Sequence, residues 1–383
     1  MFLGSGRAGF AAALVIAAGL GILPFLGAPA RAAEDLFSVT GVAVDETAET
    51  AAKAREAAIA AGQRKALDRL LRRLTPRADY GRLPVLDDTE VTALVRGFEI
   101  EEEKTSPTRY LAKLTIRFKK NGVRDLLRQS AIPFTETVSK PILVLPVYEF
   151  AGTRLLWDDP NPWRQAWAEQ RPRDTLVPLI VPRGDLGDVA AISEAQALAG
   201  DDDRLAAIAG RYGVDDVLVA HAATTIELGT GVPRLRVVLQ RYGRDDERTF
   251  VESFSGSSRG EIEPLLAEAV RRIVARLEED WKRETQLQFD SPEQLSASVP
   301  VADLGEWLEI RRRLATVAEV RRTEIASLTR RDIQLVLHYL GEPIQLVTAL
   351  AQRDLDLTEE GGYWTLRLRT SPETSAATPA TAR

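Results

Sequence analysis

The stretch KPILVLPVYEF, from Lys140 to Phe150, decides the fold class of this 383-residue chain. Its apolar residues follow one another almost without interruption, which is typical of a strand that is buried on both faces of a sheet. A second run of this kind, VDDVLVA, lies at residues 214–220. Helical patterns lie between and after the two runs. The sequence therefore predicts a central sheet covered by helices, with a smaller unit on each side.

Residues 1–32 differ in composition from the rest of the chain. Arg7 is the only charged residue before Arg31, residues 8–26 are almost wholly apolar, and residues 30–32 fit the small-x-small cleavage pattern. These features are typical of a cleaved secretory signal peptide. The alternative is an uncleaved helix that anchors the protein in the inner membrane, since the apolar run is about long enough to span a bilayer. No later stretch approaches that length, so we expect no transmembrane segment after cleavage.

Composition limits the available chemistry. The chain contains no cysteine, which excludes disulfides, thiol catalysis, thiolate metal sites and a lipid-modified N-terminal cysteine. Removal of residues 1–32 takes away two of the 50 basic residues and none of the 56 acidic ones, so the formal charge becomes −8. A net acidic chain argues against general nucleic-acid binding.

The first predicted unit, residues 33–138, has a small α+β pattern. The expected elements are a strand at 36–44, a helix at 47–74, a short helix at 90–96, a hairpin formed by 98–100 and 110–118 around a charged loop at 101–108, and a helix at 122–129. Five basic residues crowd the long helix: Arg64, Lys65, Arg69, Arg72 and Arg73. Such a face binds an anionic partner in some proteins and is a solvated helix surface in others.

The central unit, residues 139–288, is predicted to be an α/β domain with a mixed sheet. Asn161 and Pro162 have the residue types that begin a helix, and Asp201 and Gly213 bracket another. Residues 235–241 and 249–254 are expected to form an antiparallel pair, followed by an amphipathic helix over 261–286.

The third unit, residues 289–370, has the order strand, helix, strand, strand, helix, strand. This order is the split βαβ, or ferredoxin-like, plan. The helix after Asp303 is expected to use Leu304, Trp307, Leu308, Leu314 and Val317 as its apolar set. Residues 371–383 are rich in Ser, Thr, Ala and Pro and are predicted to be a disordered tail. The predicted fold class is therefore a multi-domain α+β and α/β protein.

The sequence lacks the common motifs for catalysis and cofactor binding. The two histidines, His221 and His338, do not belong to a zinc motif, and the sequence contains neither a Walker A motif nor Gly-x-Ser-x-Gly. His221 follows a buried strand, where a general base is sometimes placed in α/β sheets, but a lone histidine is more often structural. We therefore predict no catalytic residue, no cofactor and no metal site.

One segment combines aromatic and acidic residues and is the candidate binding site. Its members are Trp157, Asp158, Asp159, Asn161, Trp163 and Trp167. Tryptophan faces beside acids suit sugar binding, and paired carboxylates suit glycoside hydrolysis. The other interpretation is an ordered loop whose tryptophan rings seal a junction between domains.

Five stretches together resemble one known family. They are AREAAIAAGQRKALDRLLRRL at 54–74, PILVLPVYEF at 141–150, LLWDDPNPWRQAW at 155–167, YGVDDVLVA at 212–220 and YWTLRL at 363–368. With these stretches the chain resembles the exported proteobacterial proteins of the domain-of-unknown-function 2066 family. The middle region is distantly similar to the N-terminal domain of TolB, and the first and middle regions are also similar to an exported flagellar-ring assembly protein. The resemblance implies a periplasmic protein and no particular reaction.

These observations lead to one leading hypothesis and two alternatives. We expect a non-catalytic periplasmic protein that binds or scaffolds cell-envelope proteins, because the export signal and the multi-domain layout occur without a catalytic motif. The alternatives use the segment 157–167 either as a glycan- or peptidoglycan-binding module or as a glycan hydrolase with Asp158 or Asp159 as its acid.

Overall fold

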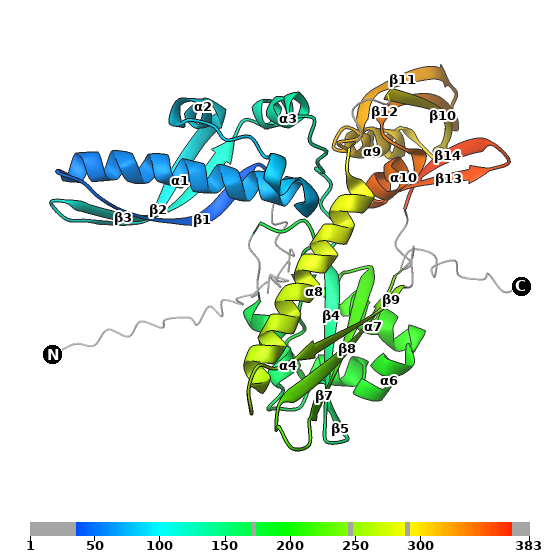
Figure 1. The fold of residues 1–383 in the computed structure, drawn as a ribbon. Helices are drawn as coiled ribbons and strands as arrows, with labels where there is room; N and C mark the ends of the chain where they lie inside the picture. The colour runs from blue at the N-terminus through cyan, green and yellow to red at the C-terminus, as the bar shows by residue number, and fades with distance from the viewer. Residues whose placement is uncertain (1–35, 171–173, 244–247, 288–291, 370–383) are drawn as a thin grey trace, which may run out of the picture. The chain divides into compact units, whose positions relative to one another are not determined.

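A computed structural model describes residues 36–170, 174–243, 248–287 and 292–369 (Figure 1). The predicted signal peptide at 1–32 and the predicted tail at 371–383 lie outside these residues. Helices and strands alternate along the described chain, and the strands form three sheets within it. The predicted multi-domain α+β class is confirmed. The division at residues 138 and 288 stays a prediction.

The first region builds a three-stranded sheet with the order β1-β3-β2. Its elements are β1 (Ser38–Thr47), α1 (Ala51–Leu74), the 3-10 helix η1 (Arg77–Arg82), α2 (Asp88–Leu94), β2 (Val95–Thr105), β3 (Arg109–Phe118) and α3 (Lys120–Gln129). Small residues let α1 approach the sheet closely: a side chain at Gly62 would place its Cβ only 2.6 Å from Leu114. This contact explains the alanine-rich first half of the helix.

The hairpin is longer than the sequence predicts. Residues 101–105 belong to β2, so the predicted loop at 101–108 is wrong, and only residues 106–108 connect the two strands. An ion pair holds the extension to β3, from Lys113 to Glu102 at 2.8 Å. This part of β2 is exposed on both faces, so its sequence lacks the alternation that marks a half-buried strand.

The central region contains the sheet with the order β5-β4-β7-β8-β9, and β6 also pairs with β4. Its strands are β4 (Ile142–Phe150), β5 (Thr153–Leu155), β6 (Leu179–Ile180), β7 (Asp216–Ile226), β8 (Pro233–Tyr242) and β9 (Arg248–Ser255). Its helices are α4 (Pro162–Glu169), α5 (Leu186–Ala191), α6 (Glu194–Ala199), α7 (Asp202–Tyr212) and α8 (Ile262–Thr285). β4 and β7 are parallel neighbours, and the pairs β7–β8 and β8–β9 are antiparallel.

The strand β4 within the stretch 140–150 is buried on both faces, as predicted. Ile142 and Val144 belong to the apolar cluster that also contains residues of α4 and α8. Leu143 and Leu145 belong to a second cluster on the other face, which contains residues of α7. Helices on both faces therefore exclude water from β4, which is why its apolar residues do not alternate with polar ones.

The last region holds the sheet with the order β11-β12-β10-β14-β13. Its elements are β10 (Pro292–Pro300), α9 (Leu304–Leu314), β11 (Val320–Leu328), β12 (Asp332–Leu340), α10 (Pro343–Ala351), β13 (Leu355–Glu360) and β14 (Tyr363–Leu368). The first three strands follow the split βαβ plan. The place of a single fourth strand is taken by a hairpin, in which β14 runs parallel to β10 and β13 forms the edge.

Two residues predicted for the buried apolar face of α9 are exposed to solvent. Leu304 is 70% exposed and Leu308 is 46% exposed, whereas Trp307, Ile310 and Leu314 are buried. Leu304 and Leu308 are four residues apart and so share a side of the helix different from the buried one. Within the described ranges, none of the helices combines the length and the apolar character needed to cross a bilayer.

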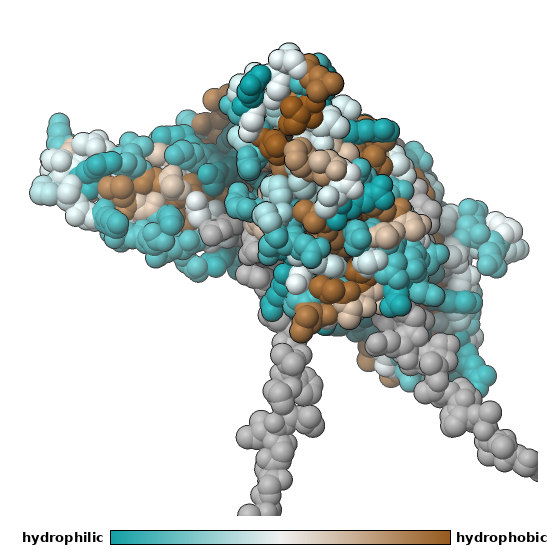
Figure 2. Space-filling model, turned by 90° about the horizontal axis from the view of Figure 1, so that it is seen from below, coloured by the Kyte–Doolittle hydropathy of each residue, from teal (hydrophilic) through white to brown (hydrophobic). Residues whose placement is uncertain are grey.

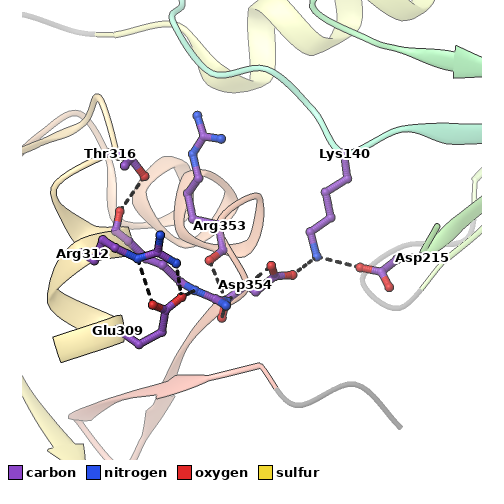
Figure 3. A network of polar contacts seen from close by, with 8 residues as sticks. Lys140, Asp215, Glu309, Arg312, Thr316, Arg353 and Asp354 are labelled. Carbon is purple, nitrogen blue, oxygen red and sulfur yellow. Dashed lines mark hydrogen bonds and ion pairs between the residues drawn. The ribbon is translucent and has the colours of Figure 1, made fainter. Parts of the chain in front are cut away.

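A polar network connects the start of the central sheet with the loop between α10 and β13 (Figure 3). The Lys140 ammonium lies 2.7 Å from the Asp215 carboxylate and also donates to Asp354. Asp354 receives a second cation, because Arg313 approaches its other oxygen at 3.4 Å. The network neutralises two carboxylates that precede β7 and β13.

The same network contains a carboxylate with a strongly lowered pKa. Arg312 and Arg313 donate hydrogen bonds to Glu309 and lower the pKa of its side chain from 4.5 to about 2. We expect a pH titration of the Glu309 side-chain resonance to give this value in the native protein. The double substitution Arg312→Gln and Arg313→Gln should return the pKa to the ordinary range. An ordinary pKa for Glu309 in the native protein would contradict its hydrogen bonds with Arg312 and Arg313.

Candidate functional site at the carboxyl ends of the central parallel strands

The structure places the predicted binding segment inside the central core. Trp163 and Trp167 are buried and pack edge to face, with ring centroids 5.6 Å apart and an interplanar angle of 81°. The Trp163 Nε1–H donates to the carbonyl oxygen of Ala220 on β7 at 2.9 Å. These two rings fill the space between α4 and the sheet, so their faces are not open to a sugar.

The other members of the segment hold the loop that precedes α4. Asn161 is buried and caps the helix, because its Oδ1 accepts from the Arg164 backbone N–H at 2.9 Å. Trp157 is half-buried and donates to the carbonyl oxygen of Ile192 at 2.7 Å. Asp158 and Asp159 are exposed, and Asp159 pairs with Arg164 at 2.6 Å. This arrangement favours the ordered-loop interpretation, with the rings in the core of one region rather than between domains.

Polar side chains meet where β4 ends beside the middle of its parallel neighbour β7. His221 Nε2 lies 3.0 Å from Glu149 Oε2, and Arg154 Nε donates to the same oxygen at 2.9 Å. The hydrogen bond from Arg154 lowers the pKa of Glu149, and the contact with His221 adds to this effect while burial opposes it. Glu149 is therefore held ionised between two nitrogen-bearing side chains.

The trio lies near the carboxyl end of β4, and α/β sheets bind ligands at the carboxyl ends of their parallel strands. Its side chains supply charge and hydrogen-bonding groups. Among the described residues, the hydrogen-bond partner found for His221 is Glu149. The described residues also contain no group of three or more side chains arranged to hold a metal ion. The trio can bind a polar or charged group of a partner.

Exposed apolar side chains lie at the same end of the sheet. Phe150 ends β4, Ile226 ends β7, and Leu228 in the following turn is 97% exposed. We call these three residues, together with Glu149, Arg154 and His221, the carboxyl-end surface. Strand alternation places Phe150 and Ile226 on one face of the sheet and the polar trio on the other. Figure 2 is viewed from below and so looks onto this end of the central sheet, where apolar side chains interrupt the hydrophilic surface.

Charged residues flank the apolar turn. Glu227 precedes Leu228 and pairs with Arg234 on β8 at 2.7 Å, and this pair lowers the pKa of Glu227. Apolar side chains surrounded by paired charges form the pattern of a protein interface, in which a dry centre lies inside a polar rim.

A small cavity lies near the other end of the same strands. It measures about 30 Å³ and is lined mainly by apolar side chains, including Ile142, Leu218, Phe250, Leu277 and Trp281. A cavity of this size holds about one or two water molecules. It is too small for a cofactor.

Comparisons with known proteins cover only parts of the chain. Residues 33–136, about a quarter of it, match the family described as a domain of unknown function (DUF8605). No curated protein matches. A solved lipoprotein, GNA1162 from Neisseria meningitidis, is 16% identical over 36% of this chain and 97% of that chain, with a TM-score of 0.22. This similarity is too low to indicate a shared fold or function.

The family match confirms the family resemblance seen in the sequence only in part. Both are families of unknown function, but the match is to DUF8605 and not to the 2066 family that the five stretches resemble. The specific family is therefore not confirmed. The match also ends before the central sheet, so it gives no information on the carboxyl-end surface.

Sequence reasoning found His221 and missed its neighbours. Glu149 stands at the end of the same apolar run that predicts β4, so its position at a strand end was visible. The parallel register that pairs Val147 with His221, and brings Glu149 beside it, depends on tertiary structure. Ile226 and Leu228 gave no signal, because apolar residues next to a strand are normally taken as part of it.

Proposed function

We propose that the protein is a non-catalytic periplasmic protein that binds or scaffolds cell-envelope components through protein–protein contacts, and that the carboxyl-end surface makes the main contact. The observation that supports it is the exposure of Leu228 in the turn after β7, together with the partial exposure of Phe150 and Ile226 at the ends of β4 and β7. Burying apolar surface contributes about 25 cal/mol of favourable free energy per Å². Exposed apolar side chains of this kind therefore favour binding of a partner that covers them. The pattern of residues 1–32 supports export.

The trio offers polar contacts at the same end of the sheet, on the face opposite Phe150 and Ile226. Arg154 and His221 carry donors that can bind acidic or carbonyl groups, and arginine is enriched among residues that dominate binding energy. The alternatives based on glycans receive less support, because the rings of Trp163 and Trp167 are buried. A glycan role would depend on Asp158 and Asp159 alone.

The proposal is tested with Leu228→Glu. After crosslinking in living cells and purification of the protein, we expect the recovery of crosslinked envelope proteins to fall about tenfold or more, as the loss of about 1.4 kcal/mol of binding energy gives. Val85→Glu is the matched control, because Val85 is 98% exposed in a loop of the first region. Equal recovery from the two variants, or no partner for the native protein, would count against the proposal. Retention on purified sacculi would favour the glycan alternative.

A further inference from the structure

The basic stripe of α1 lies along the edge strand β1. Lys65, Arg69 and Arg73 are spaced by four residues and therefore share one side of the helix. Lys65 donates to the carbonyl oxygen of Ala43 at 3.1 Å. Arg73 donates to the carbonyl oxygens of Leu36 and Ser38 at 2.9 and 3.0 Å. The two outer members of the stripe thus bind backbone oxygens of β1.

The middle member of the stripe has no such acceptor. Among the described residues, no hydrogen bond or ion pair is found for Arg69, and its side chain is exposed. The strand opposite it is irregular: the register of β1 on β3 shifts between Val39 and Val42, and Gly41 has a φ of +61°. A bulge disrupts the regular spacing of the strand's carbonyl groups at this point.

A polar cavity of about 350 Å³ opens at this bulge. It is lined by Thr40, Gly41, Arg69, Arg73 and Asp174. Ligand sites start at about 300 Å³, so the cavity is large enough for a small molecule or for one group of a larger one. Two guanidinium groups and one carboxylate line it, which leaves one net positive charge.

A carboxylate of the protein already uses part of this cavity. Asp174 Oδ2 accepts from the Thr40 backbone N–H at 3.0 Å, and Oδ1 accepts from the Thr40 hydroxyl at 3.1 Å. The Arg73 guanidinium lies 3.6 Å from the same carboxylate, and both side chains are about nine-tenths buried. The bulge therefore offers an arrangement of donors that suits an oxyanion, and Arg69 remains beside it with its charge uncompensated.

We propose that this cavity binds a small oxyanion, a carboxylate or phosphate group, between Arg69, Arg73 and the bulge of β1. Arg69 supplies the main contact, because a guanidinium binds carboxylate and phosphate groups through two parallel hydrogen bonds. The negative charge of Asp174 opposes the binding of highly charged anions at the site. The site shares no residue with the carboxyl-end surface and does not depend on the proposed function.

The test is a titration of the purified protein with inorganic phosphate and, separately, with succinate, at constant ionic strength in a chloride buffer. The probes are the backbone amide resonances of Thr40 and Gly41, and calorimetry gives the affinity. We expect saturable shifts with a Kd on the order of 1 mM. Saturation by one anion identifies the preferred group, and saturation by both identifies an unselective oxyanion site. No saturation by either anion overturns the proposal.

Three variants separate the site from general attraction by a basic helix. Arg69→Gln should weaken binding about tenfold or more. Arg55→Gln removes the same charge from an exposed position of α1 outside the cavity and should leave the Kd unchanged. Asp174→Asn should tighten binding several-fold, since it removes a negative charge from the site. Equal weakening by Arg69→Gln and Arg55→Gln, or weaker binding by a folded Asp174→Asn protein, contradicts the proposal.

Discussion

Replacing Trp163 with alanine is expected to lower the free energy of unfolding by about 3–5 kcal/mol. Trp163 is fully buried and contacts Trp167 edge to face, so the substitution leaves a large cavity between α4 and the sheet. It also removes the hydrogen bond that the indole donates to the carbonyl oxygen of Ala220. The measurement is denaturant unfolding followed by the fluorescence and circular dichroism of the protein.

Trp163→Phe is the matched control. It keeps much of the ring and removes the donor, so we expect about half the loss or less. A loss below about 1 kcal/mol for Trp163→Ala would show that the ring is dispensable to the core and would reopen a ligand-binding role for this segment.

Replacing Glu319 with glutamine is expected to stabilise the protein at neutral pH by about 1–2 kcal/mol. Glu319 is 1% exposed, and no hydrogen-bond partner for its Oε2 is found in the described part of the chain. Its Oε1 accepts from the Thr137 hydroxyl at 2.6 Å, a contact that glutamine can keep. Burial raises the pKa of Glu319, and the nearby Glu136 adds to this effect, whereas Thr137 and Arg353 oppose it.

The sign of the pH dependence follows from that direction. An acid whose pKa is higher in the folded state binds more protons there than in the unfolded state, so stability falls as the pH rises from the unfolded value of 4.5 through the folded value. We expect native protein to lose stability over this range and Glu319→Gln to lose less. Glu324→Gln, at an exposed position of β11, is the control. Parallel profiles of stability against pH for native protein and Glu319→Gln would contradict the burial of the Glu319 carboxyl group and the rise in its pKa.

The parts of the fold that the sequence predicts well are those governed by burial. The apolar run of β4 requires cover on both faces, and the alternation of Ile333, Leu335 and Leu337 predicts a strand with one buried face. The parts that it misses depend on contacts distant in sequence. Leu304 and Leu308 fit a helical apolar stripe, yet α9 packs through a neighbouring side, and local spacing does not distinguish the two.

The two candidate sites differ in how far the sequence could indicate them. His221 and Glu149 each belong to a recognisable strand, but their contact depends on the parallel register of β4 and β7. The basic stripe of α1 is visible in the sequence as a set of charges. The structure is needed to show that Lys65 and Arg73 donate to backbone oxygens. It is also needed to show the bulge in β1 near Arg69.

The most direct test of the proposed contact surface is site-specific photocrosslinking in living cells. A photoreactive phenylalanine analogue at Leu228 is compared with the same analogue at Val85, two positions of almost equal exposure. We predict a discrete crosslinked envelope protein at position 228 and none at position 85. The same bands at both positions, or no band at position 228, would contradict the claim that the carboxyl-end surface binds a partner.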